Sequence, residues 1–231
     1  LRIDKLISKE IASIGSITLV RQSMFSLLAI VLYSQLDKWG QLEYADTLGV
    51  AGGSHSIAIY GLIRGYTLFI AFPIIGIMQG LMPIISYNYG AKNWDRVKDS
   101  VWLAIKWTTL ISLVLLSVIV IFPKQLIGIF TEDKDLLAHT PRVLRLIFIS
   151  LPIMGVGFIG GGYFQAVGKP IPALVLTLAR QGLFMIPLMY ILGHVIGLDG
   201  VWASIPTGEI FAGIWAAIWL YLEVNKKKEL A

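Results

Sequence analysis

The stretch Ile57–Tyr87, IAIYGLIRGYTLFIAFPIIGIMQGLMPIISY, decides the fold class of this chain. It carries a single charged residue, Arg64. An α-helix needs about 20 mostly apolar residues to cross the roughly 30 Å hydrocarbon core of a bilayer. This stretch exceeds that length, so we expect a kinked or tilted transmembrane helix whose neighbours satisfy the backbone groups that proline frees. Its candidate kink or hinge residues are Pro73, Gly76, Gly80 and Pro83.

The composition of the whole chain agrees with a membrane protein. Apolar residues make up 56% and charged residues 14% of the 231 residues, and the mean hydropathy is +0.76. Soluble domains have about 45–50% apolar and about 25% charged residues, because their surface needs polar cover. The absence of cysteine excludes disulfides and thiol chemistry. No basic and aromatic patch of the nucleic-acid-binding kind is present, so we expect membrane lipids and no nucleic acid as partners.

Apolar stretches of transmembrane length occur six times, joined by short connections. We therefore predict an all-α membrane protein, a six-transmembrane-helix bundle occupying residues 16–223. Residues 1–15 predict an amphipathic helix lying along the cytoplasmic membrane surface, and residues 224–231 a basic cytoplasmic tail. The predicted spans are about Ile17–Leu36, Ile57–Tyr87, Val101–Phe122, Val143–Phe164, Ile171–Leu192 and Val201–Tyr221.

Loop charges predict the orientation of the bundle. With six spans, both termini and every second loop share one side, and that side carries ten Lys and Arg residues against three on the other. Positive charge is retained on the cytoplasmic side, so we expect a multi-pass inner-membrane protein with both termini in the cytoplasm. The ten are Arg2, Lys5, Lys9, Lys92, Arg96, Lys98, Lys169, Lys226, Lys227 and Lys228, and the three are Lys38, Lys124 and Lys134.

Several motifs carry a family resemblance that extends over nearly the whole chain. Pro73–Lys98 is similar to the end of a signature helix of the multidrug and toxic compound extrusion (MATE) family, and IGSITLVRQSMFSL is similar to the start of its seventh helix. Leu178–Gln181 and Phe164–Pro170 also resemble that family, as does Gly200–Ala203 with Pro206 and Glu209 behind it. The order of these motifs resembles the second of two homologous six-helix lobes. Because the sequence begins at Leu1 with no signal peptide, we expect a piece of a longer chain.

The resemblance implies a function. MATE-like transporters export organic, often cationic, compounds in exchange for inward-moving Na⁺ or H⁺, without ATP. Some branches place carboxylates in the seventh and tenth helices, yet Ile17–Leu36 and Val143–Phe164 hold no Asp or Glu. The chain therefore resembles the DinF-like branch, which implies that the coupling acid lies in the first helix of a missing N-terminal six-helix lobe.

Two ionisable residues lie near the predicted middle of the membrane. At about 1.5 Å per residue, Arg180 and Glu209 both lie about 12–14 Å deep, on consecutive spans joined by a tight turn. Charges at that depth are costly, so we expect the two to share a polar network. A structural pair and a gating or proton-linked pair both remain open.

Further transport-pathway candidates are polar residues nearer the span ends. Arg21 and Arg64 lie one to two turns inside, where anchoring and a pathway role are both possible. Gln79 and Gln165 lie near kinks or span ends, where hydrogen bonds between helices are the alternative. Pairs of glycines four apart, such as Gly157 and Gly161, predict close helix contacts. The histidines His55, His139 and His194 are predicted to be solvated, with no partner at metal spacing.

Motifs of intramembrane enzymes are absent. The sequence has no G-x-S-x-G, no H-E-x-x-H and no phosphate-binding G-x-x-x-x-G-K-[ST], and no span carries two acids. We therefore expect no enzyme, no catalytic residue, no metal and no cofactor. Two alternatives to a drug exporter remain: a lipid-linked saccharide flippase of the wider superfamily, and a non-transporting membrane subunit.

Overall fold

The computed structural model describes the backbone of residues 5–229 and the side chains of residues 19–225. Within these ranges the chain is helical and contains no strand. The order is α1 (Lys5–Glu43), α2 (Ala51–Gly90), α3 (Trp94–Ile121), α4 (Pro123–Gly128), α5 (Lys134–Phe148), α6 (Leu151–Ala166), α7 (Pro170–Leu178), the π-helix η1 (Ala179–Met185) and α8 (Ile186–Glu229).

These helices make six passes through the bundle. Among the described residues, α1 from Leu19, α2 and α3 are each long and apolar enough to cross a membrane, and α5 with α6 passes the same test as one bent pair. The run Pro170–Asn225 has 56 residues. At about 1.5 Å per residue it would extend about 84 Å, far more than one crossing. The backbone leaves the helical region at Ile196 and Gly197, and this turn divides the run into two passes. The predicted fold class, a six-transmembrane-helix bundle, is confirmed.

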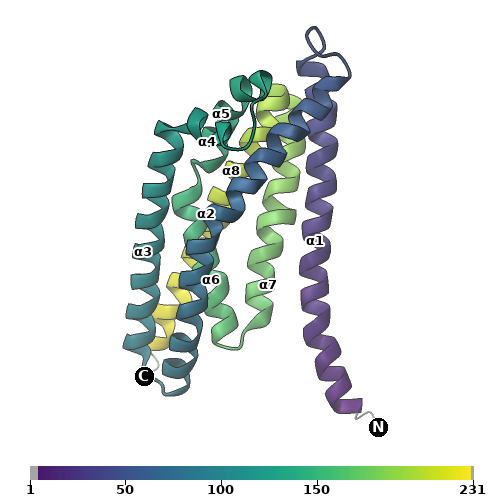
Figure 1. Ribbon diagram of the computed structural model, residues 1–231. Helices are drawn as coiled ribbons and strands as arrows, with labels where there is room; N and C mark the ends of the chain where they lie inside the picture. The colour runs from purple at the N-terminus through teal and green to yellow at the C-terminus, as the bar shows by residue number, and fades with distance from the viewer. Residues whose placement is uncertain (1–4, 230–231) are drawn as a thin grey trace, which may run out of the picture.

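Successive passes run antiparallel, so turns gather at two ends of the bundle (Figure 1). Both described termini lie at one end, together with the turns that carry Lys92 and Lys169. We call this the basic end. The opposite end holds residues 44–50, the segment around α4 and α5, and the turn at Gly197. We call it the acidic end, because Asp46, Glu132, Asp133 and Asp135 lie there.

The first two helices are longer than the membrane requires. Helix α1 runs without a break from Lys5, so the predicted surface segment and the first span share one helix axis. The amphipathic face predicted within residues 1–15 and the tail residues 226–231 lie outside the described side chains. Helix α2 keeps Pro73 and Pro83 inside a single 40-residue helix that crosses the bundle at a tilt (Figure 1).

The fourth predicted span, Val143–Phe164, is broken. Helices α5 and α6 meet at 49° across Ile149 and Ser150. Pro152 stands in the first turn of α6 and has no N–H to continue the hydrogen bonding of α5. The backbone N–H groups of Ile153 and Met154 donate to the carbonyl of Ser150 instead, which starts a new helix in a new direction.

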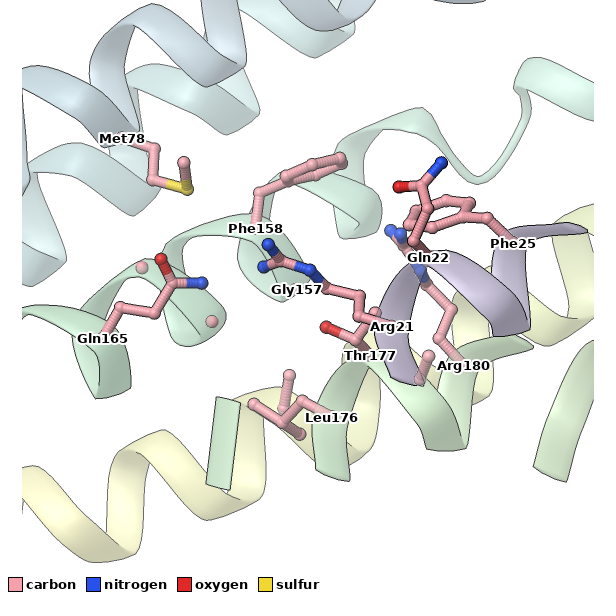
Figure 2. Close-up of a pocket in the computed structure, with 14 residues that line it drawn as sticks. Arg21, Gln22, Phe25, Met78, Gly157, Phe158, Gln165, Leu176, Thr177 and Arg180 are labelled. Carbon is pink, nitrogen blue, oxygen red and sulfur yellow. The ribbon is translucent and has the colours of Figure 1, made fainter. Parts of the chain in front are cut away.

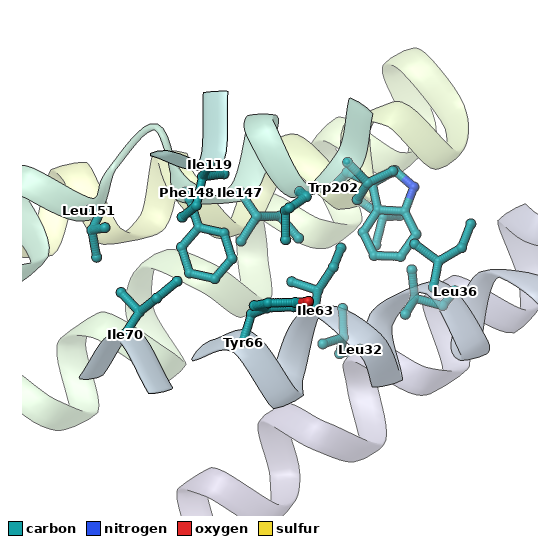
Figure 3. Close-up of a cluster of buried hydrophobic side chains, with 14 of the residues drawn as sticks. Leu32, Leu36, Ile63, Tyr66, Ile70, Ile119, Ile147, Phe148, Leu151 and Trp202 are labelled. Atoms are coloured by element: carbon teal, nitrogen blue, oxygen red, sulfur yellow. The ribbon is translucent and has the colours of Figure 1, made fainter. Parts of the chain in front are cut away.

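The buried side chains form two clusters, one toward each end. The cluster at the acidic end draws mainly on α1, α2, α5 and α8, with single residues from α3, α4, α6 and η1. Leu36, Ile63 and Trp202 are among its most buried members (Figure 3). The cluster at the basic end joins α2, α3, α6, α7 and α8, and none of its members comes from the described part of α1. Helix α1 is therefore packed into the core only near the acidic end.

The predicted close contacts at paired glycines are not found. A Cβ added at Gly157, Gly161 or the hinge candidates Gly76 and Gly80 would meet nothing within 4 Å. The same holds at Gly61 and Gly65. The close approaches lie elsewhere, because a Cβ on Gly52 would come within 2.4 Å of the Gly40 carbonyl oxygen. The four-residue spacing therefore selected the wrong glycines, because sequence spacing does not show which face of a helix contacts a neighbouring helix.

Candidate functional site

A cavity of about 310 Å³ lies between the basic-end half of α1 and the helices α6, α7 and α8. Its wall contains two arginines, two glutamines and a threonine among mostly small or apolar side chains. Helix α6 contributes the most residues, and its glycines leave the space that longer side chains would fill. The lining residues are Arg21, Gln22, Phe25, Met78, Gly157, Phe158, Gly161, Gly162, Gln165, Leu176, Thr177, Arg180, Ala212 and Ala216.

Arg180 enters this cavity from the π-helix η1. A π-helical turn holds one extra residue per turn and is often found at functional sites. Pro187, just past its end, lacks the N–H that would bond to the Leu183 carbonyl. The guanidinium carbon of Arg180 lies 5.2 Å from the centre of the Phe158 ring, which fits a cation–π contact.

The predicted pairing of Arg180 and Glu209 is found. Their side chains, 18% and 13% exposed, bring Nη1 and Oε2 to 3.7 Å. This distance is that of an ion pair and is too long for a hydrogen bond. Glu209 does not itself line the cavity, so it can affect the cavity only through its contact with Arg180. Whether the pair is structural or takes part in gating stays a prediction.

Arg21 and Gln165, which the sequence did not connect, face the same cavity. Figure 2 shows Arg21 reaching from α1 and Arg180 from η1 into one space, with Phe158 and Gln165 of α6 beside them. Among the residues whose side chains are described, Arg21 has no ion-pair partner. The lining contains two positive charges and no carboxylate.

The other sequence candidates lie apart from the cavity. The Arg64 guanidinium donates a 3.4 Å hydrogen bond to the Tyr33 hydroxyl on an exposed face between α1 and α2. Gln79 of α2 is exposed, and so are the hinge candidates Pro73 and Pro83. None of them lines the cavity, so the structure splits the predicted candidates into two groups.

A second polar cluster, at the acidic end, was not predicted. The rings of Tyr44, His55 and His139 pack edge to face, with centroids 5.1 to 5.5 Å apart. The Nε2 atom of His55 is buried without a hydrogen-bond partner, so the prediction that His55 is solvated was wrong. Burial and the nearby Glu43 and Asp199 raise the pKa of Tyr44 above its ordinary value, so its hydroxyl stays neutral. The rings come from distant positions, which a linear pattern does not bring together.

No group of three or more His, Asp or Glu side chains capable of holding a metal occurs within the described ranges. The lining of the cavity offers guanidinium donors, side-chain amides and aromatic faces. Such a site can bind and orient a molecule.

Comparison with known proteins gives a family. The family model MatE matches residues 22–191, most of the chain. The multidrug export protein MepA of Staphylococcus aureus (strain MSSA476) is 30% identical over 170 residues, which are 74% of this chain and 37% of MepA. MepA of Staphylococcus haemolyticus is 28% identical over 174 residues, covering 75% of this chain and 38% of that protein. The chain thus spans well under half the length of these relatives.

Solved structures show the same fold. An inward-facing multidrug resistance MATE family transporter superposes with a TM-score of 0.83 at 22% identity, covering 99% of this chain and 50% of that one. A transporter of the MOP superfamily from Pyrococcus furiosus, described as having a binding pocket of reverse polarity, gives 0.84 at 22% identity, with 98% and 49% covered. The six passes described above thus correspond to about half of a MATE transporter.

These matches make the chain a multi-pass membrane protein of a transporter family. The predicted resemblance is confirmed at the level of the family. The chain belongs to the MatE family, the multidrug and toxic compound extrusion transporters.

Proposed function

We propose that this chain is the C-terminal six-helix lobe of a secondary transporter that exports organic compounds in exchange for inward-moving H⁺ or Na⁺. The observation that carries the proposal is the superposition of 99% of the chain on 50% of a MATE transporter. Transporters built from two repeats typically bind their substrate near the midplane, between the repeats. The partner that completes the site is then an N-terminal six-helix lobe.

The proposed orientation places the basic end in the cytoplasm of a cell whose inner membrane holds the protein. Lys92, Arg96, Lys98 and Lys169 all lie in or beside the turns of that end (Figure 1). Two of these residues are held there by side-chain contacts, Lys169 with Glu223 and Lys98 with the Asn225 side chain. Positive loops of this kind stay on the cytoplasmic side.

The proposed coupling follows the DinF-like pattern. The stretches Leu19–Leu36 of the first pass and Val143–Phe164 of the fourth pass contain no Asp or Glu, so the coupling acid is proposed to lie in the other lobe. Glu209 reaches the wall of the cavity through its ion pair with Arg180. A change in the charge of that pair would alter the electrostatic field inside the cavity. Protonation of Glu209 could in this way link ion movement to binding in this lobe.

The test is efflux by the complete gene product. In cells that lack other exporters, expression is expected to lower ethidium accumulation. A protonophore that leaves the Na⁺ gradient intact abolishes the effect under H⁺ coupling and spares it under Na⁺ coupling. Ethidium accumulation equal to the empty-vector control, with the protein present in the membrane, would contradict drug export. That result would favour the non-transporting subunit instead.

The flippase alternative is less well supported. The relatives found are described as multidrug exporters, and the cavity is small for a lipid-linked saccharide. Reconstituted protein that moves a fluorescent lipid-linked saccharide across a vesicle, and does not move ethidium, would reverse this choice.

A further inference from the structure

The cavity carries more positive charge than its surroundings balance. Arg21 and Arg180 line it, and arginine stays protonated in proteins. Glu209 is the one carboxylate that forms an ion pair with either of them among the described side chains. Among the residues with described side chains, one positive charge therefore has no counter-charge in a partly enclosed space, where a bound anion would be stabilised.

The described part of the chain also leaves the hydrogen-bonding capacity of the two guanidinium groups unused. Each guanidinium offers five N–H donors in a planar fork that fits carboxylate or phosphate oxygens. Within the described side chains, neither Arg21 nor Arg180 donates a hydrogen bond to another protein group. Arg180 is held in place by the Phe158 ring and by Glu209 at 3.7 Å, so its donors remain available to a ligand.

The rest of the wall is suited to an apolar body. Phe25, Met78, Phe158 and Leu176 contribute aromatic or aliphatic surface, and Met adapts to different shapes. On α6, Gly157 and Gly161 open the space between them, because a Cβ at either position meets nothing within 4 Å. A volume of about 310 Å³ admits a compact ring system.

We propose that this cavity binds an amphipathic organic anion, a carboxylate or phosphate held by Arg21 and Arg180 and joined to an apolar body that packs on Phe158 and Met78. Gln165 adds an amide at the edge of the cavity. This inference rests on the proposed function for its location in a transporter, and it adds a ligand class opposite in charge to the organic cations expected from the family. The same headgroup chemistry could come from a soluble molecule or from an anionic membrane lipid.

The test is binding of a matched pair of fluorescent probes to the full-length gene product in phosphatidylcholine nanodiscs. Dansylglycine carries a carboxylate, and a dansyl amide of a trimethylammonium amine carries a positive charge on the same apolar body. Dansylglycine is expected to bind at least about tenfold more tightly than the cation, because it can accept charged hydrogen bonds from the arginines.

Three variants locate the binding. Arg21→Gln is expected to weaken dansylglycine binding about tenfold, because a charged hydrogen bond is lost. Gly161→Leu is expected to weaken it by filling the cavity. Arg145→Gln is the matched control, because Arg145 is exposed on α5, donates to the Val120 carbonyl and lies outside the cavity. It should leave the affinity unchanged. Circular dichroism and size-exclusion profiles identify any variant that does not fold. If Arg21→Gln does not fold, Arg21→Lys replaces it and is expected to weaken dansylglycine binding, because Lys lacks the planar pair of donors.

Nanodiscs that contain phosphatidylglycerol distinguish an anionic lipid headgroup from a soluble anion as the natural ligand. Weaker dansylglycine binding there, in the wild type but not in Arg21→Gln, assigns the site to a lipid headgroup. Unchanged binding assigns it to a soluble anion. The proposal is overturned if the cationic probe binds as tightly as dansylglycine, or if Arg21→Gln binds dansylglycine like the wild type. These measurements need no transport, so they can fail while ethidium efflux succeeds, and the reverse.

Discussion

The two ends of α1 are packed very differently. Toward the acidic end, Leu32 and Leu36 are buried at 3% and 0% exposure, and Gly40 lies against Ser56 and Gly52 of α2. Toward the basic end, Leu19 and Phe25 are 67% and 43% exposed, and Arg21 faces a cavity. One helix is thus buried in the core at one end, whereas at the other end it contacts α7 and η1 along one side and borders the cavity. The difference teaches that the acidic end anchors α1 to the lobe, while the basic-end half of α1 borders a cavity.

The largest effect is expected from removing a large side chain at the fixed end. Trp202 of α8 is 1% exposed within the acidic-end cluster. Trp202→Ala should lower the free energy of unfolding by about 3–5 kcal/mol, because it loses packing and leaves a cavity. The matched control is Trp107→Ala on α3, where the indole is 50% exposed, and the loss should stay below about 1 kcal/mol. Thermal denaturation in detergent measures both, and equal shifts would contradict the assignment of the core.

A smaller effect is expected where the backbones of α1 and α2 meet. A Cβ at Gly52 would lie 2.4 Å from the Gly40 carbonyl oxygen, and a Cβ at Gly65 would meet nothing within 4 Å. Gly52→Ala should cost about 1–3 kcal/mol by overpacking, while Gly65→Ala should be neutral or stabilise by up to about 1 kcal/mol. Melting temperatures of the two variants test this. Equal melting temperatures would mean that the acidic end is not closely packed in the membrane.

Neutralising Glu209 tests the role of the ion pair beside the cavity. Glu209→Gln leaves Arg180 without its counter-charge, and we expect a loss of about 1–2 kcal/mol, below the cost of breaking a fully buried pair, because both side chains are partly exposed. The double variant Arg180→Gln with Glu209→Gln should recover part of the loss. Transport by Glu209→Gln should also change its pH dependence. Full transport with unchanged pH dependence would leave the pair with a structural role alone.

The smallest effect is expected at an exposed ion pair of the acidic end. Arg142 Nη2 and Asp199 Oδ2 lie 2.6 Å apart, but their side chains are 76% and 47% exposed. Arg142→Gln should lower the free energy of unfolding by about 0.2–1 kcal/mol, since water and salt screen the attraction. The difference between wild type and variant should shrink as salt is raised. A difference that persists at high salt would show that this pair is more than a surface contact.

Several elements of the site were predictable and several were not. The spans were readable because a bilayer requires about 20 apolar residues per crossing. Counting along two helices joined by a turn predicted that Arg180 and Glu209 lie at a similar depth and share a polar network, and their pair is found. The inclusion of Arg21 and Gln165 in one cavity with Arg180 was not predicted, because these residues lie on three different elements.

The sequence by itself determined that this chain is a helical membrane protein, its six crossings and which loops share an end, because hydrocarbon imposes length and polarity on every segment separately. The tertiary structure alone decided the break before Pro152, the π-helical turn under Arg180 and the ring contact of His55 with His139. It also decided which glycines lie against a neighbour. These features depend on which helix faces which, and side chains far apart in sequence meet only when the helices pack.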